Sequence, residues 1–285
     1  MTHRPFLVGL VGTGVGPSLT PALHMAEASA QGLEYLYRTI DLTAAGVAPE
    51  RIGEVLDWAR TLGFDALNIT YPCKRLVIEH LDEVDDVAAE LGAVNTVIFD
   101  GPRAVGYNTD TTGFALGFTE GLPGAATDNV VLIGAGGAGA AVGDALLRLG
   151  ADHLTVVDVD VERATALANE LAAMRPEARV DASSPEKLAV LLPASDGVVH
   201  CTPTGMADHP GMPLDPELLH PGLWVTDIVY RPLDTELLHA ALAAGCRVCD
   251  GGHMAVHQAT EAFALITGIT PDAERMSRQF RRLVG

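Results

Sequence analysis

The chain is poor in basic side chains and in cysteine, and it has no long apolar run. Its 285 residues carry 18 Lys and Arg against 37 Asp and Glu, which gives a formal net charge of −19. Because a nucleic-acid-binding surface needs cationic side chains, this balance argues against a nucleic-acid partner. No segment approaches the roughly 18 consecutive apolar residues of a membrane span, and no cleavage-site pattern follows the short apolar run in MTHRPFLVGLVG. We therefore expect a cytoplasmic protein with no membrane partner.

The scarcity of cysteine also limits redox and metal chemistry. Of the four cysteines, Cys246 and Cys249 form a C-x-x-C pair, a spacing found in redox centres and zinc half-sites. A structural zinc ion needs four ligands, and the sequence has no second C-x-x-C pair to complete the set. The sequence therefore predicts reduced cysteines, no disulfide and no metal ion.

What the chain does have is a regular alternation of strand-like and helix-like segments, in two series. GLPGAATD at 121–128, rich in Gly and Pro, separates the series. In the first series we expect strands over 6–12, 35–42 and 64–70 and a hairpin of 93–100 and 103–110. We expect helices over 21–31, 49–62, 84–91 and 111–122, and the start of a further helix at 74–80. In the second we expect strands in NVVLI, HLTVVDVD, ARVDA, GVVHCTP, WVTDIVY and CRVCDGG, and a helical tail over 254–285. Length and pattern together predict two α/β domains with mainly parallel sheets.

The second series opens on a dinucleotide-binding signature. GAGGAG at 134–139 matches G-x-G-x-x-G between an apolar strand and a helix, and Asp158 follows at the end of the next strand. Gly134 would form the tight turn, Gly136 would admit the pyrophosphate, Gly139 would let helix pack on sheet, and Gly137 and Ala138 complete the motif. A carboxylate there accepts from the ribose hydroxyl of NAD and repels the 2′-phosphate of NADP, so Asp158 favours NAD. Arg163, five positions on, is a candidate ribose or adenine contact.

Polar residues follow several strands of the first series. They lie in LNITYPCK, LGAVNT and GYNTDTTG, where an open α/β sheet binds its ligands. Asn68, Thr70 and Asn95 can recognise hydroxyl groups. Lys74 and Asp110 form a candidate proton-transfer pair for oxidising an alcohol, and we treat them as one coupled unit.

The stretch GPSLTPALH marks a helix start. Thr20 before Pro21 predicts an N-cap with proline at the first helical position. Ser18 has no part in that cap. Two hydroxyls beside the N–H groups of a helix start also suit a carboxylate, because those groups and the helix dipole favour negative charge. The residues alone leave both interpretations open, a cap only or a cap that also binds a carboxylate.

Eight motifs together resemble the shikimate dehydrogenase family. In order along the chain they are SLTPALH, LNITYPCK, LGAVNT, GYNTDTTGF, GAGGAG, CTPTGM, DIVYRPLDTELL and GGHMAVHQATEAF. The resemblance covers nearly the whole chain. It implies a substrate domain formed by 1–112 and 254–285, a Rossmann domain over 113–253, and an active site in the cleft between them.

The resemblance also implies roles for individual residues. Lys74 and Asp110 would be the catalytic pair, and Ser18 and Thr20, with Tyr230 nearby, would hold the substrate carboxylate. The ring hydroxyls would be recognised by Asn68, Thr70, Asn95, Asp110 and Gln258. The nicotinamide side would be lined by Thr202, Pro203, Thr204, Gly205, Met206, Val229, Gly251 and Met254.

Two departures from the common biosynthetic members of that family point to NAD and quinate. Ser-Leu-Thr stands where those enzymes have Ser-x-Ser, and Asp158-Val159-Asp160 stands where they carry an Asn-Arg-Thr/Ser sequence suited to NADP. Both features resemble the NAD-dependent enzymes of quinate catabolism. The expected reaction is the reversible oxidation of quinate to 3-dehydroquinate and of shikimate to 3-dehydroshikimate.

Two alternatives stay open at this point. One is an NADP-dependent biosynthetic shikimate dehydrogenase or an aminoshikimate dehydrogenase. The other is a non-catalytic sensor of quinate or nucleotide on the same fold. The sequence does not fix the oligomeric state, and a homodimer is one arrangement that it allows.

Overall fold

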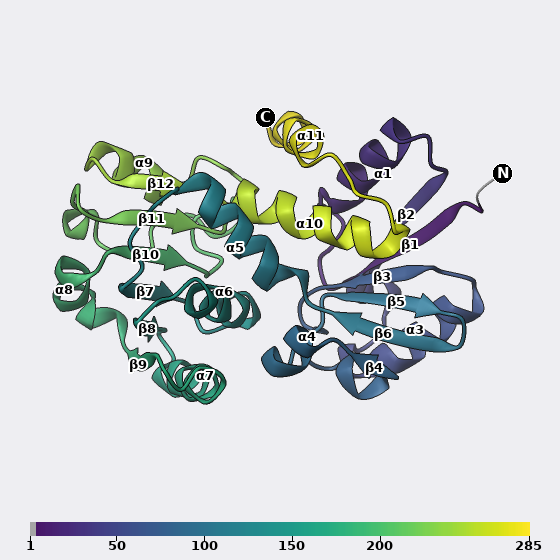
Figure 1. Cartoon of the computed structure of the whole chain (residues 1–285), viewed down its shortest axis with the longest axis horizontal. Helices are drawn as coiled ribbons and strands as arrows, with labels where there is room; N and C mark the ends of the chain where they lie inside the picture. The colour runs from purple at the N-terminus through teal and green to yellow at the C-terminus, as the bar shows by residue number, and fades with distance from the viewer. Residues whose placement is uncertain (1–3) are drawn as a thin grey trace. The chain divides into compact units, whose positions relative to one another are not determined.

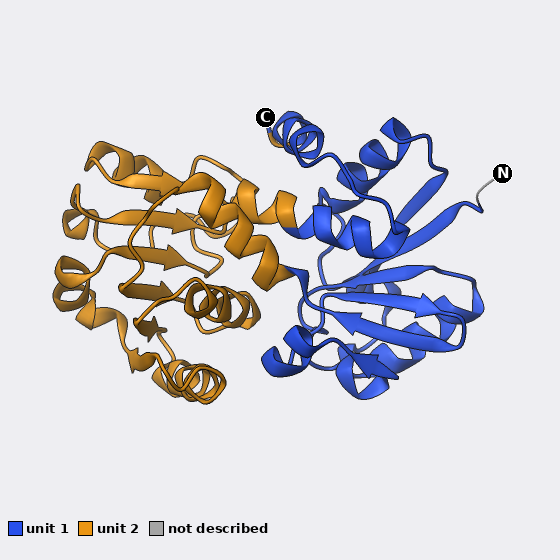
Figure 2. Ribbon diagram, in the orientation of Figure 1, with its two compact units in different colours: residues 1–109, 258–283, 285 blue, residues 110–257, 284 orange. Residues whose placement is uncertain are grey.

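A computed structural model describes residues 4–285, which divide into two compact units (Figure 2). Unit 1 runs to Thr109 and takes in Gln258–Leu283 and Gly285. Unit 2 comprises Asp110–His257 and Val284. Among the described residues, no helix is long and apolar enough to cross a membrane. The four cysteines are buried and unbridged.

Unit 1 is built on a six-stranded mixed sheet. Its strands are β1 (Phe6–Gly12), β2 (Tyr35–Asp41), β3 (Ala66–Ile69), β4 (Glu83–Val84), β5 (Thr96–Asp100) and β6 (Arg103–Tyr107), in the order β2-β1-β3-β5-β6-β4. β1 pairs in parallel with β2 and β3, while β5 and β6 form an antiparallel hairpin. The helices are α1 (Thr20–Ala30), α2 (Leu42–Ala45), α3 (Ile52–Thr61), α4 (Asp86–Leu91), the second part of α10 (Gly251–Thr267) and α11 (Ala273–Val284), with 3₁₀ turns at Pro49–Arg51 and Ile78–His80 (Figure 1).

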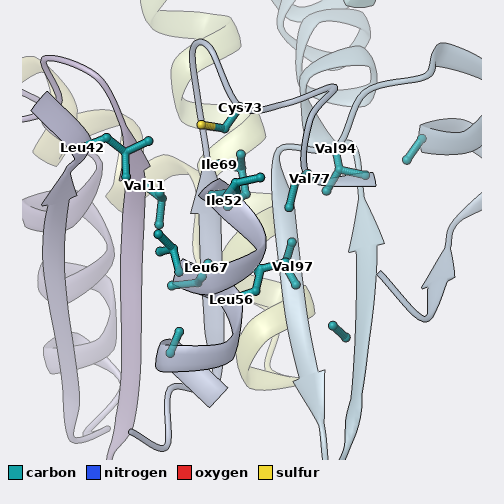
Figure 3. Packing of buried hydrophobic residues seen from close by; sticks show 14 residues of the cluster. Val11, Leu42, Ile52, Leu56, Leu67, Ile69, Cys73, Val77, Val94 and Val97 are labelled. Atoms are coloured by element: carbon teal, nitrogen blue, oxygen red, sulfur yellow. The ribbon is translucent and has the colours of Figure 1, made fainter. Parts of the chain in front are cut away.

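The two faces of this sheet bury different hydrophobic clusters, because side chains alternate along each strand. On one face Val8 and Leu10 pack with Ala28 of α1 and Phe263 of α10. The opposite face buries a larger cluster against α3, shown in Figure 3, which includes Val11, Ile52, Leu56, Leu67, Ile69 and Val97. Covering both faces leaves the ends of the strands as the places where polar groups can gather.

Unit 2 is a parallel six-stranded sheet of the dinucleotide-binding type. Its elements are α5 (Thr109–Gly121), β7 (Asn129–Ile133), α6 (Gly137–Arg148), β8 (His153–Val157), α7 (Val161–Met174), β9 (Arg179–Ser183), α8 (Leu188–Leu191), β10 (Gly197–His200), β11 (Trp224–Asp227), α9 (Glu236–Ala243) and β12 (Arg247–Cys249). The strand order is β12-β11-β10-β7-β8-β9, and every pair is parallel. The chain reverses direction across the sheet between β7 and β10, where such folds bind their nucleotide. The predicted fold class is confirmed.

Two local predictions are wrong. No α-helix starts at 74–80, which forms turns and the short 3₁₀ helix Ile78–His80, because the carbonyl of Lys74 accepts the N–H of Val94 instead of a helical partner. Thr20 is not the N-cap of α1: the cap position falls on Leu19 and no side chain caps the helix. The N–H of Thr20 donates instead to Ser18 Oγ, at 3.3 Å.

Candidate functional site

The glycine-rich turn after β7 leaves room that only glycine provides. Gly134 has a φ of +111°, a left-handed conformation that side chains disfavour. A Cβ at Gly139 would lie 1.9 Å from the carbonyl oxygen of Gly134, so α6 can approach the turn only without one. Above Gly136, by contrast, no atom lies within 4 Å of a Cβ position. The turn is therefore closed on the protein side and open on the other, as a bound pyrophosphate requires.

The start of α6 adds an electrostatic reason for an anion to bind there. Gly136 is the N-cap, so no side chain satisfies the first N–H groups of the helix. Gly136 and Gly137 are exposed, and Ala138 is half-buried. The first turn contains no acidic residue. Uncapped N–H groups and the positive end of the helix dipole favour a negatively charged ligand at this point.

Asp158 lies at the end of β8 and is almost fully buried. Its carboxylate accepts the N–H of Ala135 at 2.8 Å, the N–H of Asp160 at 3.0 Å and the guanidinium of Arg163 at 2.8 Å. Burial alone would raise the pKa of Asp158, but the bonds from Arg163 and from the two backbone N–H groups hold it below its ordinary value. The Arg163 side chain is 53% exposed. The structure thus brings together the two residues that the sequence proposed for the ribose.

The residues expected on the nicotinamide side follow β10, β11 and β12. Thr202–Met206 leave β10 as a loop, and Val229 follows β11 with its N–H bound to Asp227. Gly251 begins α10 so close to β11 that a Cβ there would lie 2.5 Å from the carbonyl oxygen of Val229. The backbone of Met254 packs closely against Gly117 of α5. A Cβ at Gly117 would lie 2.9 Å from the backbone nitrogen of Met254.

In unit 1 the two predicted asparagines form one buried hydrogen-bonded group. Asn68 Nδ2 donates to Thr96 Oγ1 at 2.9 Å, and Tyr37 donates to Asn68 Oδ1 at 2.5 Å. Asn95 Nδ2 donates to Thr109 Oγ1 at 2.9 Å, and Asn95 Oδ1 accepts the N–H of Thr109 at the same distance. Thr109 is the first residue of α5, so Asn95 holds the start of the helix whose next residue is Asp110.

The positioning groups Tyr37, Thr96 and Thr109 were missed by the sequence reasoning. Tyr37 carried the clearest signal, since a buried tyrosine hydroxyl needs a hydrogen-bond partner. Its partner Asn68 lies two strands away, across β1, and only the strand order β2-β1-β3 reveals that.

The other predicted substrate residues lie in both units, and Gln258 lies in the middle of α10. Thr70 follows β3, and its methyl group packs against Gly12 at the end of β1. A Cβ at Gly12 would lie 2.4 Å from Thr70 Cγ2. Lys74 is half-buried in the following turn. Ser18, Thr20, Asn68, Thr70, Lys74, Asn95 and Gln258 belong to unit 1, and Asp110 and Tyr230 to unit 2. The pairing of Lys74 with Asp110 stays a prediction.

Two family profiles match the chain, one in each unit. The profile described as the shikimate dehydrogenase substrate binding domain matches residues 10–97. The profile described as shikimate / quinate 5-dehydrogenase matches residues 119–206.

Individual relatives match over almost their full lengths. A protein of Streptomyces avermitilis named shikimate dehydrogenase (NADP(+)) is 59% identical over 285 residues, which is 100% of this chain and 98% of the relative. One of Corynebacterium efficiens named quinate/shikimate dehydrogenase (NAD(+)) is 47% identical over 99% of this chain and 100% of its own. The solved structure of quinate dehydrogenase from Corynebacterium glutamicum in complex with NAD superposes with a TM-score of 0.93 at 46% identity, covering 98% of this chain and 99% of that one. The chain belongs to the shikimate dehydrogenase family.

Proposed function

We propose that the protein catalyses the reversible oxidation of quinate to 3-dehydroquinate and of shikimate to 3-dehydroshikimate, with NAD as the hydride acceptor. Unit 1 would bind the substrate and unit 2 the nucleotide. The boundaries between the units, at 109/110 and 257/258, lie close to the domain boundaries at 112/113 and 253/254 that the family resemblance implies. The observation that supports nucleotide binding is the turn after β7, which leaves open space at Gly136 and Gly137 and is followed by a buried carboxylate at Asp158.

The preference for NAD rests on Asp158. A carboxylate at this strand end accepts from a ribose hydroxyl and repels a 2′-phosphate. Three donors already bind the carboxylate, whose oxygens offer about four lone-pair sites, so one acceptor position is left for a ribose hydroxyl. The corynebacterial relatives that are named for NAD support the same preference.

The chemistry on the protein side is a proton transfer. A bound nicotinamide would supply the hydride acceptor, and the proton of the substrate hydroxyl would pass to a side chain. Lys74, coupled to Asp110, is our candidate for receiving that proton. A positioned general base of this kind raises the rate about 10²–10⁴-fold. Oxidation releases a proton and reduction consumes one, so the same pair serves both directions.

The remaining polar groups would hold the substrate. Ser18 and Thr20 would bind its carboxylate, with Tyr230 beside them. Burial raises the pKa of Tyr230 despite the opposing charge of Arg231, so its phenol stays protonated and able to donate. The ring hydroxyls would meet Asn68, Thr70, Asn95, Asp110 and Gln258. The buried bonds of Asn68 and Asn95 fix these amides before any ligand arrives.

A second candidate is an NADP-dependent shikimate dehydrogenase. Arg163 favours it, because its guanidinium is half exposed beside the ribose position and could face a phosphate. The relative of Streptomyces avermitilis and one of Pseudarthrobacter chlorophenolicus, 57% identical, are both named for NADP(+).

Initial rates with quinate and shikimate, each with NAD and NADP, separate these functions. Turnover of both substrates with NAD as the better cofactor supports the proposal. Turnover of shikimate alone with NADP supports the second candidate. Nucleotide binding without turnover would make the protein a sensor and overturn both.

A further inference from the structure

A buried chain of hydrogen bonds joins the ends of β10 and β11 in unit 2. His200, the last residue of β10, is fully buried, and so is Asp227, the last residue of β11. His200 Nδ1 lies 2.9 Å from Asp227 Oδ1, and His200 Nε2 lies 2.5 Å from Thr202 Oγ1. Neither His200 nor Asp227 belongs to the set of site residues described above.

The direction of the first bond follows from the chemistry of the partners. A carboxylate only accepts, so Nδ1 of His200 carries a hydrogen and donates to Asp227. Nε2 of His200 forms the second bond of the ring, with the Thr202 hydroxyl. The Thr202 oxygen in turn accepts the N–H of Thr204 at 3.3 Å and lies 3.2 Å from its hydroxyl. His200 therefore fixes the rotamer of Thr202, whose oxygen orders the next turn of the loop.

Asp227 is itself held from two other sides. Its Oδ1 accepts the N–H of Val229 at 3.0 Å, and its Oδ2 accepts the hydroxyl of Thr235 at 2.7 Å. Thr235 also caps α9 through the N–H of Leu238. His200 is thus anchored to a rigid strand end and helix start.

The far side of Thr202 faces the glycine-rich turn. A Cβ at Gly134 would lie 2.9 Å from Thr202 Cγ2 and 2.7 Å from the carbonyl oxygen of Cys201. With its hydroxyl bound to His200, Thr202 turns its methyl group toward Gly134. A change in the Thr202 rotamer would therefore disturb the pyrophosphate turn and the Thr202–Met206 loop together.

We propose that His200 is a positioning residue of the nucleotide site: held by Asp227, it locks Thr202 so that the Thr202–Met206 loop keeps its shape against Gly134. This role rests on the proposed nucleotide-binding function. It makes His200 act on nucleotide affinity through Thr202, without touching the ligand.

Two substitutions separate the roles of the two ring nitrogens, because each keeps one hydrogen bond of the imidazole and removes the other. His200→Asn places an amide near the position of Nδ1, which keeps the donor to Asp227 and removes the contact with Thr202. His200→Gln reaches the position of Nε2 and gives up the bond to Asp227, so it serves as the mirror control. Thr202→Val removes the same hydroxyl bond from the other partner at nearly constant shape.

The test is the dissociation constant of NADH, measured by its fluorescence, beside the KM for NAD and the melting temperature. One net hydrogen bond predicts that His200→Asn weakens NADH binding about three- to tenfold. His200→Gln, which loses a buried bond of the same ring but keeps the contact with Thr202, should lower the melting temperature as well and keep the NADH affinity of the parent. The double variant His200→Asn/Thr202→Val should bind as weakly as either single variant, because both remove one bond.

Unchanged NADH affinity in His200→Asn, or losses that multiply in the double variant, would overturn the positioning role. If His200→Asn fails to fold, Thr202→Val and His200→Gln decide together: a loss of about three- to tenfold in Thr202→Val with parental affinity in His200→Gln supports the proposal, and parental affinity in Thr202→Val overturns it. If the unmodified protein binds neither NADH nor NADPH, the proposed function itself fails, and the role of His200 with it. A parent that binds and turns over NAD, with variants that match it, refutes only the role of His200.

Discussion

Acid should destabilise unit 1 through His24, and the substitution His24→Phe should remove that sensitivity. The imidazole is fully buried on α1 between Tyr35, Tyr37 and Phe263, with ring centroids 5.2–6.1 Å away. Nδ1 lies 3.1 Å from the Tyr35 hydroxyl, and Nε2 has no hydrogen-bond partner among the described residues. Burial lowers the pKa of His24 from 6.5 to about 3. A proton on His24 is therefore bound far more readily by the unfolded chain than by the folded one.

The sign and size of the effect follow from linkage. Because the folded-state pKa is depressed, stability is complete above about pH 6.5 and is lost as the pH falls from 6.5 toward 3. At 1.36 kcal/mol per pH unit, the loss is about 2 kcal/mol by pH 5 and about 5 kcal/mol once the pH passes below 3. The cost of fitting a phenyl ring does not depend on pH, so it shifts the whole curve and leaves its slope unaffected.

Urea denaturation at several pH values between 7.5 and 5 measures this slope. As the pH falls over that range, we expect the free energy of unfolding of the parent to decrease by about 2 kcal/mol more than that of His24→Phe. His239→Gln, at an exposed histidine of α9, is the control and should run parallel to the parent. A His24→Phe curve that also runs parallel to that of the parent would show that protonation of His24 is not linked to unfolding.

Three further predictions concern the site itself. Lys74→Ala should lower kcat about 10²–10⁴-fold with a much smaller change in KM. The control Lys187→Ala changes the only other lysine of the sequence and should leave both constants unchanged. Equal kinetics for the two variants would contradict the role of Lys74. Asp158→Asn should lower kcat/KM for NAD about tenfold and raise it for NADP, through loss of one charged acceptor; steady-state rates with both cofactors check this, and an unchanged ratio counts against it. Gly136→Ala should melt like the parent, because its Cβ meets no atom within 4 Å, but should lose NADH binding, whereas Gly139→Ala should lose stability; tight NADH binding by Gly136→Ala would disprove the pyrophosphate site.

Features set by neighbouring residues could be read from the sequence. The glycine turn, the helix after it and Asp158 occupy consecutive elements, and their spacing alone places them at one strand end. The mainly parallel sheets and the β5–β6 hairpin also follow from local patterns of apolar residues and turns. Local patterns failed where a backbone group found a distant partner, as at Lys74, whose carbonyl binds Val94 instead of continuing a helix.

Contacts that cross the sheet could not be read in the same way. Tyr37 reaches Asn68 over β1, and His200 reaches Asp227 on the neighbouring strand, 27 residues away. Each contact depends on strand order and register, which the alternation of apolar residues does not encode. At the α1 start, Thr20 follows the usual capping pattern, yet the N-cap falls on Leu19 and Ser18 takes the N–H of Thr20. Those hydroxyls stay our candidates for the substrate carboxylate.

We propose that this chain oxidises quinate and shikimate with NAD. Initial rates of the purified protein with each substrate and each cofactor measure that activity. We expect turnover of both quinate and shikimate, with a higher kcat/KM for NAD than for NADP. Turnover of shikimate only, with NADP as the better cofactor, would rule this function out.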